Sequence, residues 1–325
     1  MRPEDSAIAR IRPPLHGRGA GLWWGALGVI AFSFTMPFTR VAVEDGAMSP
    51  LFVGSARAVL AAVLAGAALA VTRQRVPRGT QWVRVGIVAA GAVVGFPLLT
   101  SYALTGVPAS HGAVVVALLP AMTAVMAVVR AGERPRPWFW VAAGVGALAA
   151  VSFAALQHGG LGAAGAPDLL LFAAVIVCAI AYAEGGLLSR ELGSWQTISW
   201  ALVLAAPLML VLTGIAVVDT PPEGTAREWA ALAYLGVISM FLGFVAWYRG
   251  LAIGPIARVG QVQLAQPVLS IVWAGLILHE PITWTTIVGG AVVVACALLA
   301  VRTRGSAAGR PAAGIPSGVS GSVAE

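Results

Sequence analysis

Ten apolar segments follow one another along the chain, separated by short polar connections. An α-helix rises 1.5 Å per residue, so roughly 20 apolar residues cross the ~30 Å hydrocarbon core of a bilayer. Short connections make consecutive helices antiparallel neighbours. The pattern therefore predicts an all-α membrane protein of about ten transmembrane helices. The expected spans are 21–43, 49–72, 82–104, 109–130, 138–156, 168–189, 196–218, 228–250, 256–278 and 282–301.

The chain divides into two similar halves, 21–157 and 166–303, between two polar ends. Residues 1–20 form a basic tail rich in proline, glycine and arginine, and residues 304–325 are expected to be a disordered tail. A shift of 147 residues superimposes unlike landmarks of the two halves. Similar composition explains matched alanines but not matched tryptophan, proline and glutamate, so we infer an internal repeat. The matched pairs are Trp82 with Trp229, Leu104 with Leu251, Pro108 with Pro255, Pro120 with Pro267 and Glu133 with Glu280.

The two repeats are expected to cross the membrane in opposite directions. Arginines precede Trp82, whereas the equivalent stretch before Trp229 is mainly acidic. Cytoplasmic loops of membrane proteins carry an excess of arginine and lysine, so equivalent loops lie on opposite sides. An odd number of spans per repeat, five here, requires this inversion. Inverted repeats are typical of secondary transporters, whose site lies near the midplane between the repeats.

The arginines also give the orientation. With both termini placed in the cytoplasm, only Arg40 and Arg227 fall on the outer side, each at the edge of a span. Glu44 and Asp45 collect on that outer side. The pattern predicts a multi-pass protein of the cytoplasmic (inner) membrane with both termini cytoplasmic.

Composition supports this class and removes others. The 325 residues are 59% hydrophobic and 10% charged, against about 25% charged in soluble domains. The sequence has no lysine, so it lacks the lysine of a Walker A loop and of a Schiff base. The net charge of +7 comes from arginines beside apolar runs, so we expect no nucleic-acid partner.

Two prolines lie near the centres of equivalent spans, Pro120 and Pro267. Proline removes a backbone N–H and opens the helix, and open backbone at that depth is tolerated where it lines protein or a wet cavity. A symmetric pair of helix breaks is thus a pointer to a binding cavity, with a simple packing kink as the alternative.

Polar side chains surround the second proline. Gln263 and Gln266 are three residues apart on one helix face, and Ser270 continues that face. Amides in hydrocarbon need hydrogen-bond partners, so these side chains are expected to face inward. They are candidates for substrate binding, with hydrogen bonding between helices as the alternative.

Glu184 is a carboxylate inside the sixth span, towards its cytoplasmic end. A carboxylate in the membrane is a functional hypothesis by default, here a carrier of a coupling proton. The alternative is an ion pair with Arg190 or a side chain that reaches the cytoplasmic interface. Tyr182, Trp247 and Tyr248 lie at similar depth and could stack on a substrate or belong to an interfacial aromatic belt.

Two further features read as structural. Arg57, a third of the way into the second span, is expected to reach Glu44, Asp45 or the interface. Small residues recur in the third span, among them Gly86, Gly91 and Gly95, and indicate close helix packing.

Enzyme signatures are missing from the sequence. It has no G-x-S-x-G, no H-E-x-x-H and no Cys–His cluster, so we expect no catalytic residue, cofactor or metal.

Several segments together resemble the EamA-type branch of the drug/metabolite transporter superfamily. "LLPAMTAVMAVVRAGERPRPWFWVAAGVGALAA" resembles the fourth and fifth helices, where a mid-helix proline precedes a Gly-Glu pair. "QLAQPVLSIVWAGLILHEPITWTTIVGGAVVVACALLA" resembles the same unit in the second repeat, with His279 in place of the usual glycine. "SARAVLAAVL" and "GLWWGALGVIAFSF" resemble the second and first helices. The resemblance covers roughly residues 20–303.

The resemblance implies ten helices and transport of amino acids, nucleobase-like compounds or other small metabolites, often outward. We therefore expect a secondary exporter that works by alternating access around a midplane cavity. Alternatives are an integral membrane enzyme acting on lipid-linked substrates and a non-transporting membrane subunit. The expected partners are a small-molecule substrate and the lipid bilayer, and a homodimer is possible.

Overall fold

A computed structural model describes residues 20–131, 137–157, 165–253, 259 and 262–305. The described residues form helices joined by short turns, without a strand. Most of the two predicted tails, 1–20 and 304–325, lies outside these residues. Two of the repeat landmarks, Glu133 and Pro255, also lie outside them.

The first half of the chain contains the first five expected spans. Three of them are built from more than one helical segment, because the α-helix is interrupted within the membrane. The segments are α1 (Ala20–Ser33) and α2 (Thr35–Val43); α3 (Pro50–Val71); α4 (Thr80–Val88), the π-helix η1 (Ala89–Gly95) and α5 (Phe96–Gly106); α6 (Ala109–Val116) and α7 (Leu119–Ala131); and α8 (Pro137–Gln157).

The second half follows the same order. Its segments are α9 (Ala166–Leu192); α10 (Ser194–Asp219); α11 (Ala226–Tyr234), the π-helix η2 (Leu235–Gly243) and α12 (Phe244–Ile253); α14 (Ala265–Ile277); and α15 (Trp284–Gly305).

The predicted all-α membrane fold is confirmed. Within the described residues, nine helices or helix combinations are long and apolar enough to cross a membrane. The expected ninth span, 256–278, is described in part and includes the shorter apolar helix Ala265–Ile277. Large apolar side chains such as Val63, Leu148 and Val218 are exposed on the outer faces, as lipid contact requires.

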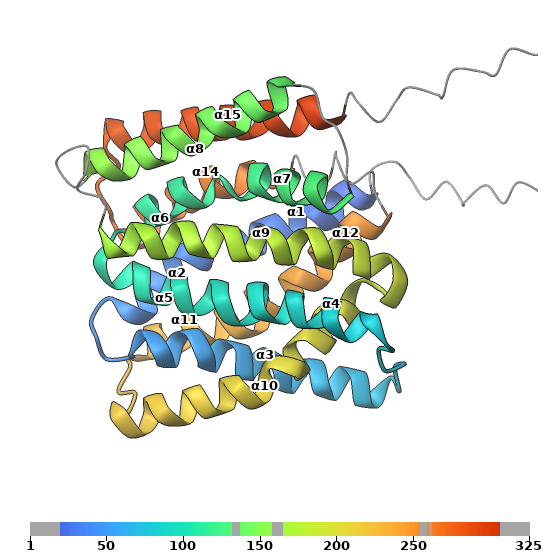
Figure 1. The fold of residues 1–325 in the computed structure, drawn as a ribbon. Helices are drawn as coiled ribbons and strands as arrows, with labels where there is room; N and C mark the ends of the chain where they lie inside the picture. The colour runs from blue at the N-terminus through green and yellow to red at the C-terminus, as the bar shows by residue number, and fades with distance from the viewer. Residues whose placement is uncertain (1–19, 132–136, 158–164, 254–258, 260–261, 306–325) are drawn as a thin grey trace, which may run out of the picture.

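Contacts between helices of the two halves come in equivalent pairs, in which each helix is replaced by its counterpart in the other half. α1 packs against α12, and the equivalent pair, α9 and α5, also packs. α7 and α6 lie along α9, just as α14 lies along α1 and α2. α3 packs on its own equivalent α10 at one end of the molecule, and α8 packs on α15 at the other (Figure 1). The two five-helix repeats therefore meet along a shared interface through the middle of the bundle.

Glycines allow the closest of these approaches. A methyl group on Gly91 would lie 2.2 Å from the carbonyl oxygen of Val177 in α9, and one on Gly250 would lie 2.7 Å from the backbone nitrogen of Gly25 in α1. The packing role predicted for Gly91 and Gly95 is confirmed, because both contact Val177. At Gly86 an added methyl group would meet open space, so this glycine makes no such contact.

Candidate functional site: a cavity between the two repeats

Helices of both repeats are interrupted near the middle of the bundle, each shortly before a proline. The first span breaks between Ser33 and Thr35, ahead of Pro37. The fourth span breaks at residues 117–118, ahead of Pro120, and the ninth turns at residues 263–264, ahead of Pro267. Proline has no N–H for the carbonyl four residues back, so each break leaves one carbonyl to be satisfied elsewhere.

Two of these freed carbonyls have identifiable donors. The oxygen of Ser33 accepts a hydrogen bond from the Ser270 hydroxyl at 2.6 Å. The oxygen of Gln263 accepts one from the backbone N–H of Gln266 at 3.0 Å. Ser270 thus stabilises the break in the first span from the second repeat, which ties the two halves together at this level.

The third and eighth spans carry a second kind of interruption, the π-helices η1 and η2. A shift of 147 residues places Ala89–Gly95 on 236–242, within η2 (Leu235–Gly243). The two π-helices are therefore equivalent in the repeats. π-helices are rare, widen the turn locally and occur often at functional sites.

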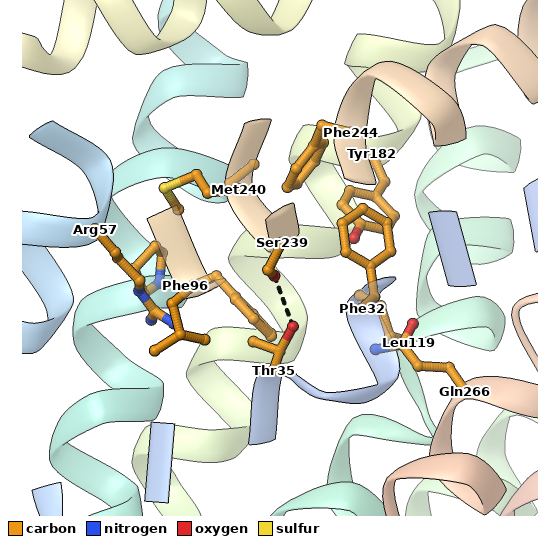
Figure 2. Close-up of a pocket in the computed structure, with 13 residues that line it drawn as sticks. Phe32, Thr35, Arg57, Phe96, Leu119, Tyr182, Ser239, Met240, Phe244 and Gln266 are labelled. Atoms are coloured by element: carbon orange, nitrogen blue, oxygen red, sulfur yellow. Dashed lines mark hydrogen bonds between the residues drawn. The ribbon is translucent and has the colours of Figure 1, made fainter. Parts of the chain in front are cut away.

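All these irregular segments meet at one internal cavity (Figure 2). Its volume is about 20 Å³, which is room for about one water molecule. The lining comes from both repeats, and nearly all of it is buried. The lining residues are Phe32, Thr35, Arg57, Ala92, Phe96, Pro97, Leu119, Tyr182, Leu235, Ser239, Met240, Phe244 and Gln266.

Polar groups from four helices reach this cavity. The hydroxyls of Thr35 and Ser239 share a hydrogen bond of 2.7 Å across the repeat interface (Figure 2). The amide oxygen of Gln266 is buried and has no hydrogen-bond partner among the described residues. Arg57 contributes a guanidinium group. The cavity can therefore offer a cation, an acceptor and hydroxyl groups to a ligand.

Aromatic rings form one wall. Phe32 and Phe244 meet edge to face with centroids 5.0 Å apart, and Tyr182 meets Phe244 in the same way at 5.7 Å. Trp247 and Tyr248 lie behind them, at 6.2 Å from Tyr182 and 5.7 Å from Phe244 respectively. Such a wall suits an apolar or aromatic group.

The candidate residues chosen from the sequence differ in their position relative to the cavity. Tyr182 and Gln266 line the cavity. Trp247 and Tyr248 form a second layer behind its aromatic wall, and Ser270 supports the helix break at Ser33. Gln263 is buried at the turn before Pro267 and is not part of the lining, and its amide nitrogen has no partner among the described residues.

The expectation for Arg57 was wrong. Its side chain does not reach Glu44, Asp45 or the interface; it is 2% exposed and lines the cavity. Its guanidinium donates to the hydroxyls of Thr39 and Thr100 at 3.2 and 3.1 Å. A long side chain a third of the way into a span can reach inward as well as outward, and hydroxyls on two neighbouring helices hold it inward.

Glu184 belongs to an ion cluster with two arginines, Arg84 and Arg130. It accepts hydrogen bonds from Arg84 and, at 2.9 Å, from Arg130, and Arg84 also binds Glu191. The sequence left open an ion pair with Arg190 or a side chain that reaches the interface. The structure shows an ion pair, but its partners are Arg84 and Arg130 and not Arg190. The cluster joins α4, α7 and α9.

Glu280 and His279, from the Gly-Glu position of the second repeat, have structural roles. The carboxylate of Glu280 accepts the backbone N–H groups of Ala109 and Ser110 at 2.7 and 2.9 Å, at the start of α6. His279 has a positive φ of 54°, a conformation that favours glycine. This backbone explains why glycine is usual before the glutamate.

Comparisons with known proteins agree with this architecture. The chain is 45% identical over 278 residues to the uncharacterized transporter YdeK of Bacillus subtilis, covering 86% of this chain and 96% of YdeK. It is 27% identical to the aromatic amino acid exporter YddG of Ancylobacter novellus, covering 90% and 96% of the two chains. A protein named as a probable terminal-alkyne amino-acid exporter of Streptantibioticus cattleyicolor is 24% identical, with coverage of 86% and 92%.

A solved crystal structure has the same fold, with a TM-score of 0.61, 20% identity and coverage of 89% of this chain and 99% of that one. The sequence model of the EamA-like transporter family matches residues 19–154 and again residues 166–302. Each match covers one five-helix repeat. The chain belongs to the EamA-like transporter family.

Proposed function

We propose that this membrane transporter is a secondary exporter of amino acids or closely related metabolites. One observation carries the proposal: three proline-associated helix breaks and two equivalent π-helices converge on a polar and aromatic cavity between the repeats. Open backbone beside a midplane cavity is the arrangement that secondary transporters use for substrates. The names of two relatives, an aromatic amino acid exporter and a terminal-alkyne amino-acid exporter, support the substrate class and the direction.

Alternating access accounts for the small size of the cavity. A volume of about 20 Å³ cannot hold an amino acid, so the described conformation is closed around the site. The cluster of Arg84, Glu184 and Arg130 holds α4, α7 and α9 together on the predicted cytoplasmic side. Opening on that side would break the cluster and separate these helices, which would admit substrate from the cytoplasm.

Counterflow of labelled amino acids in proteoliposomes tests the proposal. Purified protein is reconstituted with unlabelled L-phenylalanine or L-leucine inside, and entry of the labelled compound is measured. Transport above that of protein-free liposomes supports the proposal. Absence of flux for every amino acid in a panel of all twenty, in protein that is folded and inserted, would contradict it.

A pair of matched variants ties the flux to the cavity. Ala92→Leu adds three carbons to a buried lining residue, whereas Ala90→Leu makes the same change two residues away on an exposed face of the same π-helix. We expect Ala92→Leu to lower counterflow at least tenfold and Ala90→Leu to leave it within twofold. Equal flux in the two variants would place the substrate path elsewhere.

A further inference from the structure

Arg57 is a buried cation with no acidic partner in the described part of the chain. The ion pairs found there involve Arg40, Arg84, Arg130 and His111, and none includes Arg57. Two of its nitrogens donate to threonine hydroxyls, and Nε has no acceptor among the described residues. The side chain is 2% exposed and lines the central cavity.

Two neutral hydroxyls cannot balance this charge. A buried guanidinium is costly unless it is paired with an anion as well as hydrogen-bonded. Thr39 and Thr100 instead orient the group, because they lie on α2 and α5 and hold its two terminal nitrogens from two helices. The Thr100 hydroxyl donates to the oxygen of Phe96 at 2.7 Å, so its lone pairs are left to accept from Arg57.

The rest of the cavity complements a molecule with one charged end. Figure 2 shows Arg57 and Gln266 on opposite sides of the labelled residues, with the Thr35–Ser239 hydrogen bond between them. Phe32 and Phe244 supply the aromatic wall. Charge is thus concentrated at one side of the cavity and apolar surface at another.

We infer that Arg57 binds the carboxylate of the transported molecule, and that the substrates are organic carboxylates with an apolar or aromatic body. The planar guanidinium presents parallel N–H groups that match the two oxygens of a carboxylate, a geometry that lysine cannot copy. The inference rests on the proposed function, and it adds the chemical group by which a substrate is recognised. Binding takes place as the cavity opens, with the threonines holding the guanidinium ready.

Four probes of similar size test whether binding depends on the carboxylate or on the rest of the molecule. L-Phenylalanine and 3-phenylpropionate carry it, whereas L-phenylalaninamide and 2-phenylethylamine do not. Affinity is measured on purified wild-type protein from the ligand-dependent rise in melting temperature, which follows from selective binding to the folded state. We expect the two carboxylates to bind at least tenfold more tightly than the two analogues, a comparison that needs no variant.

Arg57→Gln keeps a hydrogen-bond donor and removes the charge. We expect it to weaken binding of both carboxylates about 10- to 100-fold and to leave the analogues within threefold. Arg57→Lys keeps the charge but loses the paired N–H groups, so it should weaken binding of the two carboxylates by an intermediate factor. Arg227→Gln is the matched control, because Arg227 is exposed, does not line the cavity and donates to the backbone oxygen of Ile277.

The outcomes distinguish this inference from the proposed function. Carboxylates that bind Arg57→Gln as tightly as wild type would overturn the inference, as would equal wild-type affinity for L-phenylalanine and its amide. If 3-phenylpropionate binds through Arg57 but no amino acid is transported, the inference stands and the proposed substrate class fails. If amino acids are transported equally well by Arg57→Gln, the function stands and the inference fails. If none of the four probes binds the folded wild-type protein, the inference is overturned.

Discussion

At the scale of single residues, the central cavity is set apart by buried polar atoms that have no partner among the described residues. Nε of Arg57 and Oε1 of Gln266 are two such atoms in its lining. Sequence could single out Gln266 and Tyr182, because an amide or a phenol inside an apolar helix is unusual. It could not single out Thr35 or Ser239. Hydroxyls in helices commonly bond to the carbonyl three or four residues back, as Ser55 does, so their presence says little about a site.

The two glutamines near Pro267 provide a prediction at this scale. Gln266 lines the cavity and Gln263 does not, so Gln266→Ala should raise the transport KM roughly 5- to 150-fold through loss of about 1–3 kcal/mol of hydrogen bonding to the ligand. Gln263→Ala should leave KM within twofold. KM and melting temperature are measured on the same purified proteins, with Gln74→Ala, in the connection after α3, as control. An unchanged KM in Gln266→Ala would remove this side chain from the binding site.

At the scale of helices, hydropathy predicts the spans well and their internal irregularities only in part. The length of an apolar segment identifies a span, because a spanning helix must match the thickness of the bilayer. Proline marks the predicted breaks in the fourth and ninth spans, and Pro37 marks a further break, in the first span, that was not predicted. The π-helices leave no signal in composition, because Ala89–Gly95 and Leu235–Gly243 read as ordinary apolar helix.

Gly91 and Gly86 give a matched test of helix packing. Gly91→Ala would place a methyl group 2.2 Å from the backbone oxygen of Val177, so the π-helix η1 and α9 must move apart. Overpacking of this kind costs about 1–3 kcal/mol, so we expect a lower melting temperature. Gly86→Ala, five residues earlier, meets open space and should be neutral or stabilising by about 0.5–1 kcal/mol, as for Gly to Ala in a helix. Equal melting temperatures would show that η1 tolerates the displacement.

At the scale of the whole molecule, the two repeats and the charged clusters at the ends define what must move. Equivalent contacts join α1 to α12 and α5 to α9, so neither half encloses the cavity alone. The repeat was visible in the sequence because large and rare residues keep one spacing. The ion cluster around Glu184 was not, because Arg84 and Arg130 lie 100 and 54 residues away and only the helix arrangement brings them together.

Glu184 and Glu191 allow the cluster to be tested. Both bind Arg84, but Glu184 is buried and also binds Arg130, whereas Glu191 is exposed. We expect Glu184→Gln to destabilise the closed conformation by about 1–2 kcal/mol, allowing for the exposure of Arg130, and to lower proton-driven flux and substrate exchange together. Glu191→Gln should have a small effect on both. If Glu184→Gln abolishes proton-driven flux and spares exchange, the carboxylate carries the coupling proton.

Topology is a further prediction for the whole chain. The distribution of arginines places both termini in the cytoplasm and residue 160, between the two halves, outside. Fusions of a reporter that is active only outside the inner membrane should therefore be active at residue 160 and inactive at the C-terminus. Fusions of a reporter active only in the cytoplasm should give the reverse. An active external reporter at the C-terminus would invert the assignment of every loop.

The equivalent π-helices also carry information about ancestry. A π-helix closes its hydrogen bonds between residues i and i+5, so each turn holds more residues than a turn of α-helix. Two π-helices at matching places, 147 residues apart, require one origin if the π-helix preceded duplication of the gene segment and two if it followed. The simpler history gives the π-helix to a five-helix ancestor. Such an ancestor would have formed its cavity by pairing two copies in opposite orientations, and the single chain would preserve that antiparallel pair in fused form.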